Sequence, residues 1–235
     1  MIDRAKSGHP GMALGSTPIL HTLYTKVLNV NPNKPDWVNR DRFILSGGHA
    51  SSLLYSVLHL SGYDLSVEDL KDFRKLGSKT PGHPELDVTP GVDASTGPLG
   101  QGFAYGVGMA ISEAYMHNKF PELIDHYTYV LCGDGDIQEG ISKEAMSIAG
   151  KFGLNKLIVL YDSNDIQLDG AVSDVYNEKL EKEALAFSWN YILLEDGNDT
   201  DAILKAIKKA KKSDKPTIIE IKTIIGDGCK NAGTT

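Results

Sequence analysis

The stretch that decides the fold spans residues 127–170 and reads YTYVLCGDGDIQEGISKEAMSIAGKFGLNKLIVLYDSNDIQLDG. It predicts an apolar strand over residues 127–132, a Gly-Asp-Gly turn, a helix, and a second apolar strand over residues 157–161 that leads into an Asn-bearing loop. A right-handed crossover makes these strands parallel, so their carboxyl ends lie on one edge of the sheet. Open α/β sheets bind ligands at that edge, and we expect the chemistry there.

The alternation of strands and helices continues on both sides of this stretch. Apolar runs predict strands over 43–45, 189–194 and 217–222, and helical spacing predicts helices over 16–30, 51–60, 66–75, 103–117 and 199–212. The fold class is therefore α/β, an open, mainly parallel sheet with helices on both faces. The 235 residues suit one domain over 1–235. We expect it to be trimmed at both ends, because residues 1–6 resemble the end of a helix and residues 226–235 are a glycine-rich loop with no closing element.

Composition excludes several classes of protein. The net charge of −7 argues against a nucleic-acid or anionic-membrane partner. No apolar run approaches the ~20 residues of a membrane helix, and no signal-peptide pattern opens the chain. Only Cys132 and Cys229 are present, too few for a disulfide framework. We therefore expect a protein of the reducing cytoplasm.

Asp134 and Asn164 follow the two central strands and stand 30 positions apart. Together with a backbone carbonyl from residues 164–166, they offer the hard oxygen ligands that magnesium or calcium prefers. Magnesium often completes its shell with phosphate oxygens, so the pair predicts a metal that holds a diphosphate. Either segment alone could be an ordinary polar turn, but both on one sheet edge favour a site.

Two glycine-rich turns lead into predicted helices. One reads SGGHAS over residues 46–51 and carries His49, which could donate to a phosphate oxygen. The other reads STGPLGQG over residues 95–102 and predicts anion binding by free N–H groups. The helix after it repeats Gly102, Gly106 and Ala110 at four-residue spacing, which indicates close approach to a neighbour or a ligand.

Two more histidines stand in stiff loops. His9 precedes Pro10 in SGHPG, and His83 lies between prolines in TPGHPE. Each could be a polar packing residue or part of a surface turn. Taken with His49, they favour a preorganised site.

These motifs together resemble transketolase. A Gly-Asp-Gly turn followed some thirty residues later by Asn is similar to the thiamine diphosphate motif, and the resemblance extends over essentially the whole chain. The matching segments are SGHPG (7–11), SGGHA (46–50), TPGHPE (80–85), GPLGQG (97–102), GDGDIQEGIS (133–142) and YDSNDIQLDG (161–170).

The resemblance implies a role for each motif residue in a pyrophosphate-binding domain. Asp134, Asn164 and the carbonyl of Ile166 would bind magnesium, for which calcium could substitute. His9 and His83 would be catalytic and pass protons near the reacting carbons. Residues of the cofactor site would be His49, Gly97, Leu99, Gln101, Gly133, Asp134, Gly135 and Asn164, and Glu139 would lie at a subunit interface.

The implied reaction transfers a two-carbon ketol unit from a ketose phosphate to an aldose phosphate. Family members carry the glutamate that activates the cofactor in a second domain, so this chain would be an N-terminal subunit or a fragment, inactive alone. Its partners would be sugar phosphates, the C-terminal domain or subunit, and a second copy in a homo-oligomer. Alternatives are a deoxyxylulose-phosphate synthase-like domain and a non-catalytic module that binds cofactor or partner.

Overall fold

The computed structural model describes residues 1–167 and 170–234, and it contains a five-stranded sheet in the order β1-β2-β3-β7-β6. All four strand pairings in this sheet are parallel. The predicted α/β fold class is therefore confirmed. The strands are β1 (Arg42–Leu45), β2 (Thr128–Gly133), β3 (Leu157–Ser163), β6 (Asn190–Leu194) and β7 (Thr217–Lys222).

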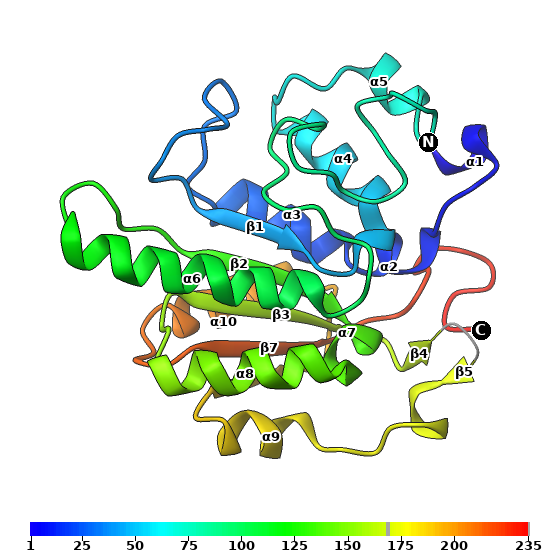
Figure 1. The fold of residues 1–235 in the computed structure, drawn as a ribbon. Helices are drawn as coiled ribbons and strands as arrows, with labels where there is room; N and C mark the ends of the chain where they lie inside the picture. The colour runs from blue at the N-terminus through cyan, green and yellow to red at the C-terminus, as the bar shows by residue number, and fades with distance from the viewer. Residues whose placement is uncertain (168–169, 235) are drawn as a thin grey trace.

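Helices cover both faces of the sheet (Figure 1). One face carries a core with α3 (Thr17–Lys26), α4 (Ser51–Leu60) and α10 (Thr200–Ala210). The other carries a core with α6 (Gln101–Lys119), α8 (Gly140–Phe152) and α9 (Leu180–Ala186). The shorter elements are α1 (Ile2–Ala5), α2 (Pro10–Gly15), α5 (Val67–Lys71), α7 (Asp134–Gln138), the 3-10 turns Gly48–Ala50 and Val172–Asp174, and the antiparallel pair β4 (Ile166–Gln167) and β5 (Gly170–Ala171).

The two central strands explain why the apolar runs were so clear in the sequence. Every residue of β2 and β3 is buried, because helices pack on both sides. Alternate side chains serve the two cores: Tyr129 and Leu131 face one, and Val130 and Cys132 face the other. The register pairs Gly133 with Asp162, so Asp134 begins beside the loop that carries Asn164.

Several predicted boundaries were wrong, and local contacts explain them. The helix predicted over 16–30 ends at Lys26, and the N–H of Asn29 instead donates to the buried carboxylate of Asp41 at 2.9 Å. The helix predicted over 66–75 ends at Lys71, and Arg74 has a left-handed backbone (φ 66°). The predicted Gly-Asp-Gly turn is the start of α7, whose first residue is Asp134.

The predicted close approach is confirmed at the two glycines of the stripe Gly102-Gly106-Ala110 in α6. A Cβ added at Gly106 would lie 2.2 Å from Cγ2 of Val130 in β2. One added at Gly102 would lie 2.5 Å from Cα of Ser46, after β1. The stripe lets α6 lie directly on the sheet and brings its N-terminus to the loop after β1.

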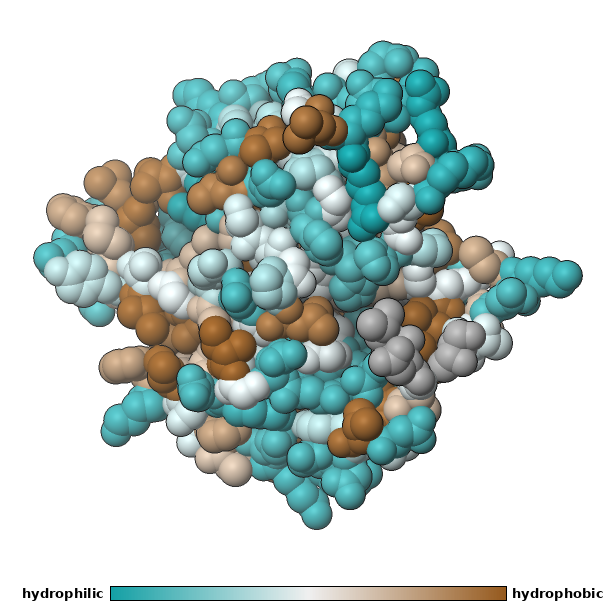
Figure 2. Space-filling view, turned by 45° about the vertical axis from the view of Figure 1, so that its right-hand side comes forward, coloured by the Kyte–Doolittle hydropathy of each residue, from teal (hydrophilic) through white to brown (hydrophobic). Residues whose placement is uncertain are grey.

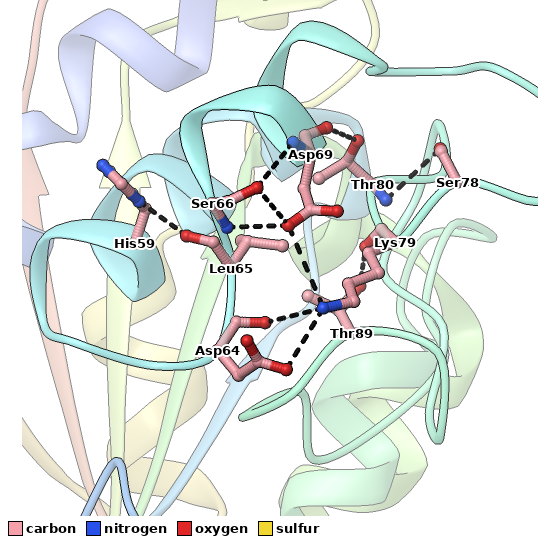
Figure 3. Close-up of polar contacts among 9 residues, drawn as sticks. All are labelled: His59, Asp64, Leu65, Ser66, Asp69, Ser78, Lys79, Thr80 and Thr89. Atoms are coloured by element: carbon pink, nitrogen blue, oxygen red, sulfur yellow. Dashed lines mark hydrogen bonds and ion pairs between the residues drawn. The ribbon is translucent and has the colours of Figure 1, made fainter.

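A polar network anchors the loop that leads to His83 (Figure 3). Ser66 caps α5 by accepting the N–H of Asp69 at 3.1 Å, and Asp69 in turn accepts from the Ser66 N–H, so the two residues form a capping box. The carbonyl of Asp69 accepts from Thr80 Oγ1 at 2.8 Å. Lys79 binds Asp64 at 3.2 Å. The network fixes Thr80, the first residue of TPGHPE.

The face shown in Figure 2 is largely hydrophilic, with apolar side chains gathered in separate patches. Within residues 1–167 and 170–234, none of the helices has the length and apolar character that crossing a membrane requires.

Candidate functional site

The predicted site lies where loops meet at the carboxyl edge of the sheet (Figure 1). The segments that follow β1, β2 and β3 carry His49, Asp134 and Asn164. The start of α2 reaches the same place, because a Cβ added at Gly47 or Gly133 would lie 2.7 Å or 3.8 Å from Sδ of Met12. Segments far apart in the sequence therefore share one edge.

Asp134 is the centre of the predicted metal site and is 4% exposed. Its Oδ1 accepts from the hydroxyl of Tyr161 at 2.5 Å, and its Oδ2 accepts from the backbone N–H of Asn164 at 3.2 Å. The structure thus brings the two predicted metal ligands into direct contact. Tyr161 is a neighbour that the sequence did not reveal, because a tyrosine in an apolar strand is typical of a core.

The loop after β3 is held by its own polar groups. The side-chain amide of Asn164 donates to Asp162 at 2.8 Å, and its carbonyl oxygen accepts the N–H of Ile166 at 3.1 Å. Asp162 is fully buried and also accepts from Thr223 Oγ1. These bonds fix the orientation of the Asn164 side chain, while its backbone N–H binds Asp134. Of the motif YDSNDIQLDG, Leu168 and Asp169 lie outside the described residues.

The Asp134 carboxylate suits a cation. Burial raises the pKa of Asp134 to about 6, and the bonds from Tyr161 and Asn164 offset part of that effect. Across residues 1–167 and 170–234, no ion pair joins Asp134 to a lysine or arginine. A buried carboxylate without a cation costs free energy, so a divalent ion bound here would relieve that cost. The residues present fit a magnesium ion.

The three histidines gather into one cluster. The ring of His9 lies 5.6 Å from the ring of His49 and 6.5 Å from that of His83, measured between centroids. Arg74 also reaches the cluster: its guanidinium lies 3.4 Å from Nδ1 of His9 and donates to Ser7 Oγ at 2.6 Å. No sequence pattern pointed to Arg74, which lies after α5 and reaches His9 only in the fold.

The environment keeps all three imidazoles neutral at pH 7. Burial, with the charge of nearby histidines, lowers the pKa of His49 to about 4. Burial and then Arg74 lower the pKa of both His9 and His83. Neutral imidazoles can accept a proton, as the predicted role of His9 and His83 requires.

We expect His49 to titrate near pH 4 in an NMR titration of its ring protons. The unfolded chain binds this proton near pH 6.5, so the folded state binds fewer protons between pH 6.5 and 4. Stability contributed by neutral His49 is therefore present above pH 6.5 and is lost as pH falls toward 4. His49→Gln should remove this contribution, and a His49 midpoint near 6.5 would contradict the burial argument.

Close contacts at glycines join the remaining loops. A Cβ at Gly97 would lie 3.3 Å from the ring of His83, and one at Gly48 would lie 2.8 Å from the N of Gly97. A Cβ at Gly135 would lie 2.7 Å from Cδ1 of Leu99. The structure thus places the GPLGQG loop between the histidines and the Gly-Asp-Gly segment, as a shared cofactor site requires.

Two predicted residues are exposed at the starts of helices. Gln101 is exposed and is the first residue of α6. Glu139 is exposed and is the N-cap of α8. Their roles beside a cofactor and at an interface stay predictions.

Asp136 is a further polar residue that the sequence did not single out. It is fully buried, two positions after Asp134, and its carboxylate accepts hydrogen bonds from Ser46 and Gly100. The signal available in the sequence was the second aspartate of GDGD, which directly follows the Gly-Asp-Gly segment.

A cavity of about 700 Å³ has Asp134 in its lining. It lies between β3, β7 and residues 171–182, and it is lined by Tyr161, Tyr191, Glu220 and Lys222 among others. Lys222 pairs with Glu220 at 2.9 Å, and Glu220 accepts from Tyr191 at 2.8 Å. These polar groups satisfy one another.

Another group of potential metal ligands lies near the amino end of β2, away from the carboxyl edge of the sheet. Glu113, His117 and Asp125 have ligand atoms within 4.8 Å of one another. The ammonium of Lys156 already binds Glu113 at 2.7 Å and Asp125 at 2.5 Å. The lysine supplies the positive charge that a metal would bring.

Comparison with known proteins assigns the family. A family model described as "Transketolase, thiamine diphosphate binding domain" matches residues 1–235. Over 240 residues, the chain is 55% identical to the transketolase of Bacillus subtilis (strain 168), covering 100% of this chain and 36% of that protein. The chain thus spans about a third of the length of the curated relatives it matches.

Solved structures give the same result. Transketolase from Leishmania mexicana superposes with a TM-score of 0.97 and 47% sequence identity, covering 99% of this chain and 36% of that one. A transketolase from Pichia stipitis in complex with sedoheptulose-7-phosphate superposes with a TM-score of 0.96 and 46% identity, covering 99% and 35%. The chain therefore belongs to the transketolase family and corresponds to its thiamine diphosphate binding domain.

Proposed function

We propose that this chain supplies the pyrophosphate-binding half of a transketolase active site, which transfers a two-carbon ketol unit from a ketose phosphate to an aldose phosphate. The observation that carries the proposal is the contact between Asp134 and Asn164 at the carboxyl edge of the sheet, beside three clustered histidines. Membership of the family supports the same reaction.

Asp134, Asn164 and the carbonyl of Ile166 would hold magnesium, or calcium in its place. Their oxygens are hard ligands, and the Asp134 carboxylate is buried without an ion-pair partner in the described part of the chain. Tyr161 orients that carboxylate through its hydroxyl. The metal would neutralise the diphosphate and fix it at the sheet edge.

The loops around the metal would hold thiamine diphosphate. His49, Leu99, Gly133 and Gly135 would contact the diphosphate, and Gly97 and Gln101 would lie beside the aminopyrimidine. When bound, thiamine diphosphate supplies the carbanion stabilisation that ketol transfer needs. The close packing of Gly135 on Leu99 and of Gly97 on His83 supports a shared cradle.

His9 and His83 would move protons to and from the substrate hydroxyl and carbonyl oxygens. Their rings lie 6.5 Å apart between centroids, and burial lowers the pKa of each, so both can act as bases at neutral pH. Substrates would be sugar phosphates, in keeping with the complex of the Pichia stipitis relative with sedoheptulose-7-phosphate.

Ketol transfer would also require a pyrimidine-binding domain, in the same polypeptide or as a partner subunit. We further propose a homo-oligomer with Glu139 at its interface. The neighbouring helices α6 and α8 expose apolar side chains, which suits a contact surface. These are Tyr105 in α6 and Ile141 and Ile148 in α8. The cytoplasm is the proposed location, since both cysteines are free thiols.

An assay of ketol transfer from xylulose 5-phosphate to ribose 5-phosphate tests this function. The chain is mixed with the matching C-terminal domain, thiamine diphosphate and magnesium, and we expect transfer that neither polypeptide gives alone. Lack of transfer by the mixture, with both parts folded, would contradict the proposal and favour a module that only binds cofactor or partner.

A further inference from the structure

We propose that Asp136 is a positioning residue that ties together three segments of the proposed diphosphate site: the loop after β1, the loop before α6 and the end of β2. The inference rests on the proposed function, because it concerns loops to which that function assigns the cofactor. It adds a residue that is not among the proposed metal ligands or cofactor contacts. Asp136 acts through hydrogen bonds to Ser46, Gly100 and Gly133, which include, precede or follow those contacts in the chain.

Each oxygen of the Asp136 carboxylate binds a different part of the chain. Oδ1 accepts from Ser46 Oγ at 2.5 Å and from the N–H of Gly100 at 2.8 Å, and Oδ2 accepts from the N–H of Gly133 at 3.0 Å. Ser46 opens the loop of His49, Gly100 follows Leu99, and Gly133 precedes Asp134. One side chain therefore sets the distances among the loop after β1, the loop before α6 and the end of β2.

The burial of Asp136 requires these bonds. The residue is 0% exposed, and no ion pair in residues 1–167 and 170–234 gives it a cation. A buried carboxylate costs free energy unless hydrogen bonds compensate. Three donors do so here, and removal of the acceptor would leave buried N–H groups unsatisfied.

Asp136 also replaces the missing cap of α6. The N-cap of this helix is Gly100, which has a left-handed backbone (φ 79°) and no side chain to accept the free N–H groups of the first turn. Asp136 accepts the N–H of Gly100, and Ser46 Oγ accepts the N–H of Phe103 at 2.9 Å. A negative charge at this helix end is favourable. The start of α6 is thus fixed against α7.

The carbonyl of Asp136 extends the same connection to α8. It accepts from Ser142 Oγ at 2.5 Å, and Ser142 lies in the first turn of that helix. The loop before α6 packs on this junction, where a Cβ at Gly100 would lie 2.8 Å from Cβ of Glu139. Movement of Asp136 would therefore shift Leu99 relative to Asp134.

Asp136→Asn tests the inference without changing the volume of the side chain. It turns one acceptor oxygen into an N–H donor that faces Gly133 or the Ser46–Gly100 pair. We expect calorimetry in the presence of magnesium to show that the substitution, made in the full native protein, lowers the affinity for thiamine diphosphate by about tenfold or more. This is the usual cost of losing a residue that supports a metal ligand. Hydrogen exchange at the amides of Gly100 and Gly133 should accelerate without any ligand.

Asp41→Asn is the matched control. Asp41 is another buried aspartate, 4% exposed, and it accepts the N–H groups of Asn29 at 2.9 Å and Tyr127 at 2.8 Å. It precedes β1 and therefore lies at the amino end of the sheet, away from the site. We expect a comparable loss of thermal stability with cofactor affinity within about twofold of wild type, as for a change outside the cradle.

Ser46→Ala is a milder variant should Asp136→Asn fail to fold. It removes one bond to Asp136 and the acceptor for Phe103, and we expect roughly fivefold weaker binding, the value of about one net hydrogen bond. Affinity in Asp136→Asn or Ser46→Ala equal to that of Asp41→Asn, with wild-type binding intact, would overturn this inference alone. A wild-type protein that does not bind thiamine diphosphate would overturn the proposed function as well.

Discussion

Asp134→Ala is expected to abolish magnesium-dependent binding of thiamine diphosphate. It removes the only carboxylate of the proposed ligand set and leaves the Tyr161 hydroxyl without its acceptor. Substitution of residues that only support the ligands already lowers metal affinity by about 10–100-fold, so loss of a ligand itself should lower it by more than about 100-fold. Isothermal calorimetry with thiamine diphosphate at a fixed magnesium concentration measures the affinity for the cofactor in the wild type and the variant.

Asp165→Asn is the control for charge in that experiment. It removes a negative charge from the same loop, but its side chain is 76% exposed and pairs with Lys222 only at 3.8 Å. Asparagine also tolerates the left-handed backbone of this residue (φ 62°). We expect binding close to wild type. Equal affinities in Asp134→Ala and wild type would refute the assignment of Asp134 as a ligand.

Gly106→Ala is expected to lower the free energy of unfolding by about 2–3 kcal/mol, despite the better helix propensity of alanine. The added Cβ would lie 2.2 Å from Cγ2 of Val130, a fully buried side chain at the centre of the sheet. Relief would require α6 to move away from β2. That movement would also disturb Gly102, which packs on Ser46.

Gly108→Ala, two residues along the same helix, separates packing from propensity. A Cβ at Gly108 would meet no atom within 4 Å, so we expect this substitution to raise the free energy of unfolding by up to about 1 kcal/mol. Urea unfolding of both variants under identical conditions gives the comparison. Similar stability changes in the two variants would contradict the close packing of α6 on β2.

Much of the fold could be predicted from the sequence because its central strands are buried on both faces. The apolar runs of β2 and β3 have no exposed positions to interrupt them. Helices α9 and α2 escaped prediction for physical reasons. In α9 only Leu180 and Ala184 are buried, too few to set a periodicity, and α2 holds glycine near both ends of its six residues.

The site was predictable where it depends on strand ends and less so where it depends on packing. Asp134 and Asn164 follow paired strands, so register alone brings them together. The anion site predicted at the start of α6 depends on which groups approach it. There, Asp136 and Ser46 already accept the N–H groups of Gly100 and Phe103, across sequence separations that no local pattern encodes.

Calorimetric titration of the native protein with thiamine diphosphate, in magnesium and then in excess chelator, tests the central claim most directly. The claim is that the edge formed by β1, β2 and β3 holds a metal-bound diphosphate. We predict saturable binding at one cofactor per chain in magnesium and its loss in chelator. Binding of equal affinity in both conditions, or none in either, would contradict the account.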